Sequence, residues 1–243
     1  MAIVREPVLA GTWYPADPAV LSADVDGYIA GARNQIAPDA IKAIIAPHAG
    51  YRFSGEVAGS AYAAIAPLRE RISRVVLIGP PHKVAFDGIA TSSADAYRSP
   101  LGDIPIDKAG VRDILRLPQV SELDQAHTKE QSLEIHLPFL QRALGDFTLV
   151  PIVGGKASPS EVGEVLANLW GGPETLIVIS TDLSHYLDYE SCRQLDARTS
   201  QAIMAGKIDD IGRDQACGRV GIKGLLRLGQ EFGLSQHLLD LRN

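Results

Sequence analysis

Four short, nearly continuous apolar runs recur along the chain and constrain its fold more than any other feature. They are Ile41–Ala46, Arg74–Gly79, Thr148–Val153 and Thr175–Ser180. Runs of this length are typical of strands that are buried on both faces. Because segments of helical character separate them, they predict parallel strand pairs joined by right-handed crossovers. We therefore expect an α/β fold whose mainly parallel sheet is covered by helices on both faces.

Helix signals lie between these runs. Asp17–Pro18 combines an N-cap residue with a proline at the first helical position, which predicts a helix start. The small-residue segment Ser54–Ile65 predicts a second helix. Thr128–Gln131 and Ser158–Glu161 both have the spacing of a capping box, so each predicts the start of a further helix. Gly88–Ser92 is a candidate for one more short strand.

Composition narrows the class of protein. No repeat or Pro/Gly/Ser-rich linker divides the chain, so we expect a single domain over residues 1–243. The net charge is −6 and acids and bases are interspersed, which argues against a nucleic-acid partner. No apolar run approaches the roughly 20 residues of a membrane-spanning helix, and no signal peptide is visible. With only two cysteines, no disulfide framework is expected, and we expect a cytoplasmic protein.

Histidines follow three of the four apolar runs. His48 comes just after the first run, His82 just after the second, and Asp182 and His185 follow the last. Parallel strands end at one edge of the sheet, where α/β proteins bind ligands, so these loops can converge. Imidazole binds iron, copper and zinc, so the pattern predicts a metal site. For each histidine alone, a structural role at a strand end remains the alternative.

Three further positions qualify this prediction. Cys217 lies just before a predicted helix, and a helix N-terminus favours the thiolate that binds metals. On the residues alone, a small buried side chain at a helix start is the simpler interpretation of Cys217. Asp182 and His185 are three residues apart, so the pair could share a turn and move a proton. Alternatively, Asp182 caps that turn.

Other candidates receive structural interpretations. Cys192 lies on an apolar stripe of helical spacing and is expected in the core. His136 borders the stripe of Leu133, Leu137, Leu140 and Leu144, while Glu134 is expected on the solvated side. His127 is expected in a loop and His237 in a C-terminal tail, and neither is given a role.

Seven motifs, in this order along nearly the whole chain, resemble the Memo family, whose prokaryotic members are called AmmeMemoRadiSam system protein B. They are REPVLAGTWYPAD (Arg5–Asp17), APHAGYRFSG (Ala46–Gly55), GPPHKVAFDGIA (Gly79–Ala90), RSPLGDIPID (Arg98–Asp107), EQSLEIHLPFLQ (Glu130–Gln141), STDLSHY (Ser180–Tyr186) and ACGR (Ala216–Arg219). Together they are far more specific than any one of them alone.

The resemblance carries several implications. It implies a three-layer α/β/α sandwich around a mainly parallel or mixed central sheet, similar to the class III extradiol dioxygenases. Position by position, it implies that His48, His82 and Cys217 are metal ligands for Fe(II) or copper. It places Asp182 and His185 in the same pocket as catalytic residues. The system name also implies radical-SAM and AMMECR-type partner proteins.

Two positions depart from the family pattern. Lys83 stands where many relatives have a second histidine, and Gln131 stands where relatives commonly read Glu-His-Ser-Leu-Glu. Because an amide does not titrate, Gln131 cannot do the acid–base work of a histidine.

Three functions compete. The first is a metal-dependent redox protein or oxygenase-like enzyme acting on a small molecule that the sequence does not identify. Cys217 in place of the usual carboxylate ligand of non-haem iron argues against assuming ring cleavage from the fold. The second is a non-catalytic metal- or partner-binding protein. The third is a hydrolase that uses Ser184 or Ser180 with His185 and Asp182, which is weakened by the absence of a G-x-S-x-G turn.

Overall fold

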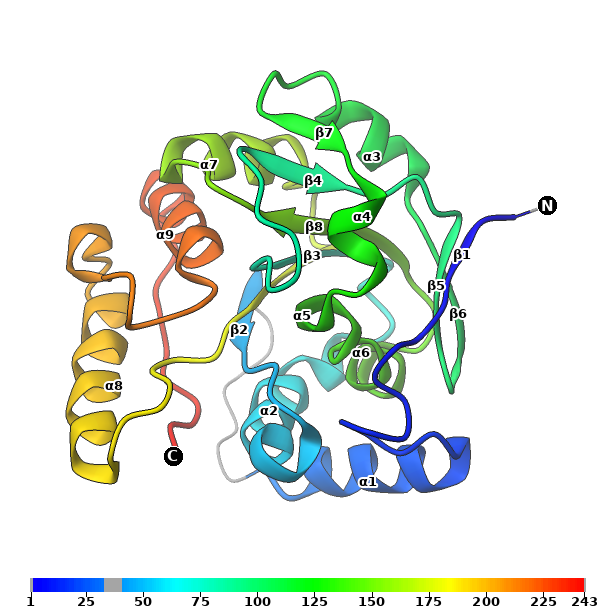
Figure 1. The fold of residues 1–243 in the computed structure, drawn as a ribbon, viewed down its shortest axis with the longest axis horizontal. Helices are drawn as coiled ribbons and strands as arrows, with labels where there is room; N and C mark the ends of the chain where they lie inside the picture. Colours follow the sequence, from blue (N-terminus) through cyan, green and yellow to red (C-terminus); the bar gives the residue numbers. More distant parts are fainter. Residues whose placement is uncertain (1, 33–40, 243) are drawn as a thin grey trace.

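A six-stranded sheet forms the centre of the computed structural model, which describes residues 2–32 and 41–242 (Figure 1). Its strand order is β2-β9-β3-β8-β4-β7. The strands are β2 (Ala43–Ala46), β9 (Thr175–Ser180), β3 (Arg74–Gly79), β8 (Thr148–Gly154), β4 (Ile89–Thr91) and β7 (Val120–Glu122). All four apolar runs are therefore strands of one sheet, as predicted.

The sheet is mixed. Strands β2, β9, β3 and β8 are parallel neighbours, with Ile44 opposite Val178 and Val76 opposite both Ile177 and Val150. Strand β4 runs antiparallel to β8, and β7 is parallel to β4. Strands β3, β8 and β9 are almost wholly buried because helices cover both faces, which explains their lack of polar alternation.

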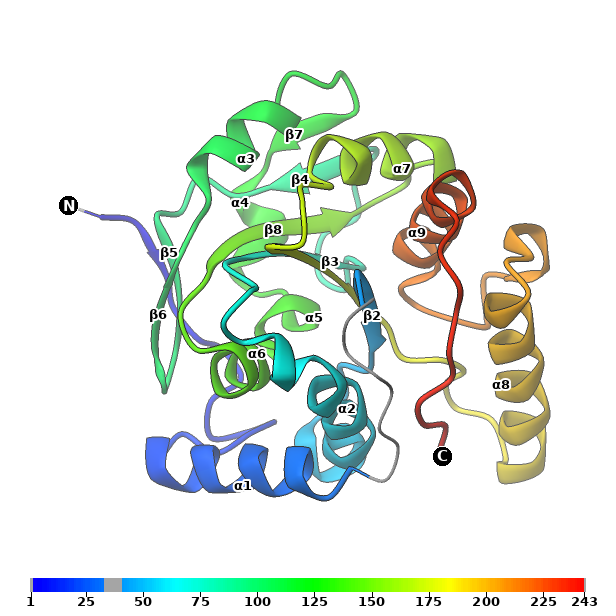
Figure 2. The same ribbon diagram turned by 180° about the vertical axis from the view of Figure 1, so that it is seen from behind.

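Helices lie on both faces of this sheet (Figures 1 and 2). One face is covered by α1 (Pro18–Ala30), α2 (Tyr51–Ile65), α5 (Gln131–Glu134) and α6 (Leu137–Leu144). The other is covered by α3 (Lys108–Ile114), α7 (Pro159–Asn168) and α9 (Arg219–Phe232), while α8 (Tyr189–Met204) lies beyond α9 at the side of the molecule. The expected three-layer α/β/α arrangement is confirmed.

A second, three-stranded sheet was not predicted. It has the order β1-β5-β6 and consists of β1 (Val4–Arg5), β5 (Ala96–Ser99) and β6 (Gly102–Pro105). These strands are two to four residues long, and β6 is mostly exposed, so they show neither a buried run nor a clear alternation. The pairing of β1 with β5 is long-range, whereas β5 and β6 form a local antiparallel hairpin.

Of the three capping predictions, two are confirmed and one is wrong. Asp17 and Ser158 cap α1 and α7 as expected, and Ser158 forms a full capping box with Glu161. The box predicted at Thr128–Gln131 is wrong, because Thr128 ends α4 (Asp124–Thr128) and Glu130 caps α5 instead. The leucine stripe is also divided between α5 and α6.

Glu134 is buried, so the expectation that it is solvated is wrong. Its carboxylate forms an ion pair with Arg5, accepts the Tyr14 hydroxyl at 2.6 Å and accepts the backbone N–H groups of Val8 and Leu9. A buried charge is stable only when it is paired and hydrogen-bonded, and Glu134 meets both conditions. This anchor holds the N-terminal segment against α5.

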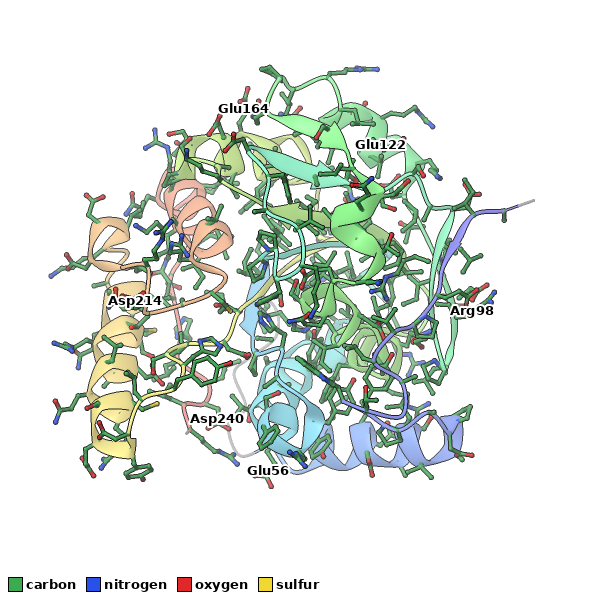
Figure 3. The ribbon with its side chains drawn as sticks, viewed as in Figure 1. Glu56, Arg98, Glu122, Glu164, Asp214 and Asp240 are labelled. Carbon is green, nitrogen blue, oxygen red and sulfur yellow. The ribbon has the colours of Figure 1, made fainter. Side chains whose placement is uncertain are left out.

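The remaining charges are mainly peripheral. Most of the side chains labelled in Figure 3, among them Glu122 and Glu164, are exposed. Within residues 2–32 and 41–242, no helix combines the length and the apolar character that crossing a bilayer requires.

Candidate metal centre

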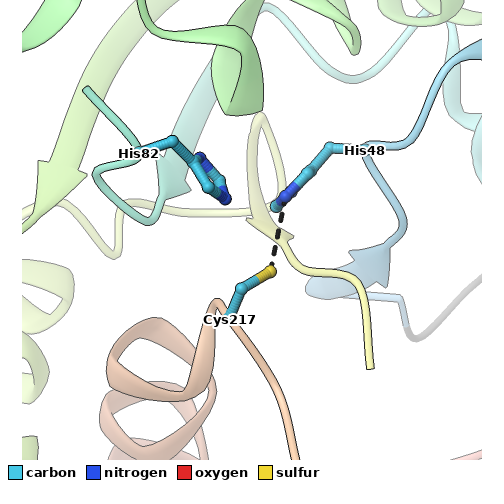
Figure 4. A group of neighbouring side chains, drawn as sticks. All are labelled: His48, His82 and Cys217. Carbon is cyan, nitrogen blue, oxygen red and sulfur yellow. Dashed lines mark hydrogen bonds between the residues drawn. The ribbon is translucent and has the colours of Figure 1, made fainter. Parts of the chain in front are cut away.

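Three neighbouring strands end beside each other and position the polar residues of the site. Strands β2, β9 and β3 are adjacent and parallel, so the segments that follow them leave the sheet at one edge. These segments carry His48, Asp182 and His82. Cys217 reaches the same edge from the start of α9, where Gly218 is the N-cap residue (Figure 4).

His48, His82 and Cys217 form one cluster, although they are far apart in sequence. One potential ligand atom from each lies within 4.8 Å of the others. Nε2 of His48 is 3.4 Å from Sγ of Cys217, and the two imidazole rings are 5.0 Å apart at 81°. His48 is buried and Cys217 half-buried, whereas the His82 side chain is 25% exposed. The predicted convergence of the three residues is therefore confirmed as geometry.

A buried hydroxyl orients His48. The Ser180 hydroxyl donates to the Ser132 carbonyl at 2.6 Å, so its oxygen is left to accept from Nδ1 of His48, also at 2.6 Å. Nδ1 of His48 therefore carries a proton, and Nε2 is the nitrogen directed at Cys217. Metal-binding histidines typically have such a partner on the second ring nitrogen.

A buried carboxylate orients His82. Glu130 accepts from Nδ1 of His82 at 2.8 Å and from the His82 backbone N–H at 2.6 Å. It also accepts the backbone N–H of Ser132 at 3.0 Å. These contacts fix both the backbone and the ring of His82, again leaving Nε2 for the cluster.

The electrostatics of the site favour a thiolate. Burial alone opposes the charged thiolate, but the neighbouring His48 and His82 outweigh it and lower the pKa of Cys217 to about 6. Burial likewise opposes a charged His82, yet Cys217 and Glu130 raise its pKa to about 9. The backbone N–H of Asp182 also donates to Sγ of Cys217 at 3.2 Å. Metal ions bind the thiolate form of cysteine, so these contacts suit a ligand.

The donor set fits a borderline or soft metal ion. Two imidazole nitrogens and one thiolate are typical ligands of zinc, copper and iron, and are unsuited to calcium or magnesium.

Asp182 and His185 lie beside the cluster. Oδ1 of Asp182 accepts the backbone N–H groups of His48 at 2.7 Å and Ala49 at 3.2 Å, while Oδ2 is 3.7 Å from Nε2 of His48. Nε2 of His185 is 4.0 Å from Oδ2 of Asp182, and the His185 side chain is 43% exposed. The carboxylate thus links the partly exposed His185 to the buried His48.

Sequence reasoning missed Ser180 and Glu130. Ser180 is the last residue of a buried strand, and the sequence suggests only a nucleophile there. Glu130 falls within a predicted capping box, yet its carboxylate contacts a histidine 48 residues away. Polar residues at the C-terminal ends of buried strands were the available signal for Ser180. No local pattern connects Glu130 with His82.

Three further expectations need correction. Cys192 is only partly buried, and its thiol contacts Ser184 and Asp196, both at 3.3 Å, so it is not a core residue. His127 is buried in α4 rather than in a loop, and Tyr97 hydrogen-bonds to its Nδ1 at 2.7 Å. His136 is fully buried rather than at the edge of the core, with Tyr62 on its Nδ1.

Comparison with known proteins identifies relatives. The family model described as Memo-like protein matches residues 5–233. The MEMO1 family protein of Aquifex aeolicus is 39% identical over 199 residues, which cover 79% of this chain and 72% of the relative. Protein MEMO1 of Xenopus tropicalis is 37% identical over 193 residues, 76% of this chain and 64% of the relative. The match thus spans less than two thirds of the length of this vertebrate relative.

A solved structure gives a weaker likeness. An uncharacterized protein of Escherichia coli K12 superposes with a TM-score of 0.41 and 13% identity, covering 69% of this chain and 80% of that chain. This likeness is too distant to carry an argument about fold or function. The family model and the MEMO1 relatives are sufficient by themselves: the chain belongs to the Memo-like family.

Proposed function

We propose that the cluster of His48, His82 and Cys217 binds a redox-active metal ion, iron or copper. The observation that carries this proposal is the approach of three ligand atoms to within 4.8 Å from three separate segments of the chain. In both imidazoles Nδ1 hydrogen-bonds to a buried oxygen, of Ser180 or Glu130, and Nε2 is left for the cluster. A purely structural role for the two histidines explains this arrangement less well than metal binding does. When bound, such an ion would supply electron transfer or a site for oxygen.

Metal analysis of protein purified without oxygen tests the proposal. We expect about one iron or copper ion per chain, because the cluster offers a single set of ligands. His48→Ala and His82→Ala should each lose the ion while keeping the fold, measured by circular dichroism. His237→Ala is the matched control, since His237 is exposed in the C-terminal segment. A folded wild-type chain that retains neither metal after incubation with each would reject the proposal.

We further propose that the protein is an oxygenase-like enzyme in which Asp182 and His185 move a proton at the metal site. The support is positional, because Asp182 lies between the partly exposed His185 and the buried His48. Oxygen uptake with a panel of catechols tests this function. Catechol-dependent uptake that is lost in His185→Ala is expected.

The second candidate is a metal- or partner-binding protein without turnover, working with radical-SAM and AMMECR-type proteins. The observation that favours it is the donor set, because a thiolate replaces the carboxylate that non-haem iron oxygenases use. Metal binding without oxygen uptake on any catechol of the panel would support this candidate over the enzyme.

A further inference from the structure

The two imidazoles of the cluster are backed by groups of different charge. Behind His48 lies the neutral hydroxyl of Ser180, which donates a hydrogen bond to the Ser132 carbonyl. Behind His82 stands the carboxylate of Glu130, whose side chain is only 1% exposed. Ser180 and Glu130 therefore both orient a histidine of the cluster, but only Glu130 adds a buried negative charge.

No lysine or arginine of the described part of the chain forms an ion pair with Glu130. Its neighbour along the chain, Glu134, is paired with Arg5, but Arg5 reaches Glu130 only at the backbone carbonyl, at 2.9 Å. Among the residues that the structure describes, His82 is the only Lys, Arg or His side chain within 4.0 Å of the Glu130 carboxylate. Apart from the backbone N–H groups of His82 and Ser132, the Glu130 carboxylate is therefore compensated through the His82 ring.

Charge balance then favours one class of ion. A buried carboxylate is costly unless a positive charge compensates it. An ion bound at Nε2 of His82 leaves the proton on Nδ1 in its hydrogen bond to Glu130. The ion then lies among three negative charges: the Cys217 thiolate, the Glu130 carboxylate behind His82, and Asp182, whose Oδ2 is 3.7 Å from Nε2 of His48. A divalent ion offsets more of this charge than a monovalent ion does.

We infer that Glu130 is a positioning residue that makes the cluster select divalent over monovalent metal ions, whereas Ser180 orients His48 without affecting this selection. The inference rests on the proposed metal site and adds its charge preference.

Zn(II) and Cu(I) are suitable probes, because both have a filled d shell and differ in charge. Dissociation constants of the full chain would be measured without oxygen, in competition with a chromophoric chelator. We expect Glu130→Gln to weaken Zn(II) binding by about 10–100-fold, the usual effect of losing a group behind a ligand, and Cu(I) binding by about threefold or less. Ser180→Ala should weaken both ions by the same factor.

Two controls separate charge from fold. Glu130→Asp keeps the charge with a shorter reach, so it should preserve the ratio of the two dissociation constants even if both ions bind more weakly. Glu122→Gln removes the same charge from the exposed end of β7 and should leave both constants unchanged (Figure 3).

Equal weakening of both ions by Glu130→Gln, or no weakening of Zn(II), would overturn the inference and leave the metal site intact. Failure of the wild-type chain to bind either ion would overturn the inference, and the proposed function would be rejected with it only if the chain also retained no iron.

Discussion

Cys217 is the residue on which the proposed metal site depends most. It is the only thiolate of the cluster, and its sulfur accepts the Asp182 N–H at 3.2 Å in addition to facing both imidazoles. Its position could not be read from its own neighbourhood, where a buried small residue was the simpler interpretation. His48 and His82 were easier to predict, because each follows a buried strand.

Replacing Cys217 by serine should therefore weaken metal binding by more than the roughly 10–100-fold typical of groups behind a ligand. A hydroxyl is a poorer and far less acidic donor than a thiol. The metal content after dialysis against a weak chelator measures the loss. Cys192→Ser is the matched control, because Cys192 lies outside the cluster. Equal retention in the two variants would leave Cys217 with a purely structural role.

A second residue-scale prediction concerns His127. Burial lowers the pKa of His127 to about 4, against about 6.5 in an unfolded chain. Between these values the unfolded chain binds more protons than the folded one, so the folded state loses stability as the pH falls from 6.5 toward 4. Above pH 6.5 the contribution is fully present.

Substituting His127 removes this contribution. In His127→Gln, the drop in unfolding free energy between pH 7 and pH 5 should shrink by about 2 kcal/mol. Urea denaturation at the two pH values measures it. His237→Gln is the control: because His237 is exposed, this variant should show the same decrease in unfolding free energy between pH 7 and pH 5 as the wild type. An unaltered drop in His127→Gln would show that His127 does not titrate as its burial implies.

At the scale of elements, the parallel strands were predictable because burial on both faces leaves a continuous apolar run. The bounds of β3 and β9 agree with the predicted segments residue for residue. Strand β1 pairs with β5 across the chain, so no local pattern shows it. The β5–β6 hairpin is local but short and partly exposed, and the only local mark of the division of α5 from α6 is Pro138 at the start of α6.

The contact between α9 and the end of β9 gives an element-scale prediction. A Cβ on Gly218 would lie 2.3 Å from the Ser180 carbonyl oxygen and 2.6 Å from Cβ of Thr181. Both are too close, so Gly218→Ala must shift the start of α9, which carries Cys217 with it. We expect a loss of about 1–3 kcal/mol in stability together with weaker metal binding. Gly233→Ala offers a comparison, since its Cβ would meet nothing within 4 Å.

The Gly218 prediction is tested best when stability and metal binding are measured separately. Gly233 has a positive φ of 67°, so its alanine variant should cost stability through backbone strain but leave metal binding unchanged. If Gly218→Ala retained the metal as well as Gly233→Ala does, the position of Cys217 would not depend on this close approach.

At the scale of the whole molecule, the Arg5–Glu134 pair joins the N-terminal segment to the helical layer, 129 residues away along the chain. Glu134→Ala would leave Arg5 buried without its counter-charge and the N–H groups of Val8 and Leu9 without an acceptor. We expect a loss of about 3–5 kcal/mol in unfolding free energy, measured by chemical denaturation.

An exposed ion pair provides the contrast. Arg98 and Asp103 lie at the surface, so Asp103→Ala should change stability little. If Glu134→Ala and Asp103→Ala lost similar amounts of unfolding free energy, burial would not be the reason that the Arg5–Glu134 pair stabilises the fold.

The span of chain that the cluster encloses has a mechanical consequence. His48 and Cys217 are 169 residues apart, so an ion bound to both would close most of the polypeptide into one loop. Closing so long a loop removes many conformations from the unfolded ensemble, as a long-range disulfide does. A chain of this kind would unfold at higher temperature with its ion than without it, and fluctuations that separate the start of α9 from the end of β2 would be the first to be suppressed.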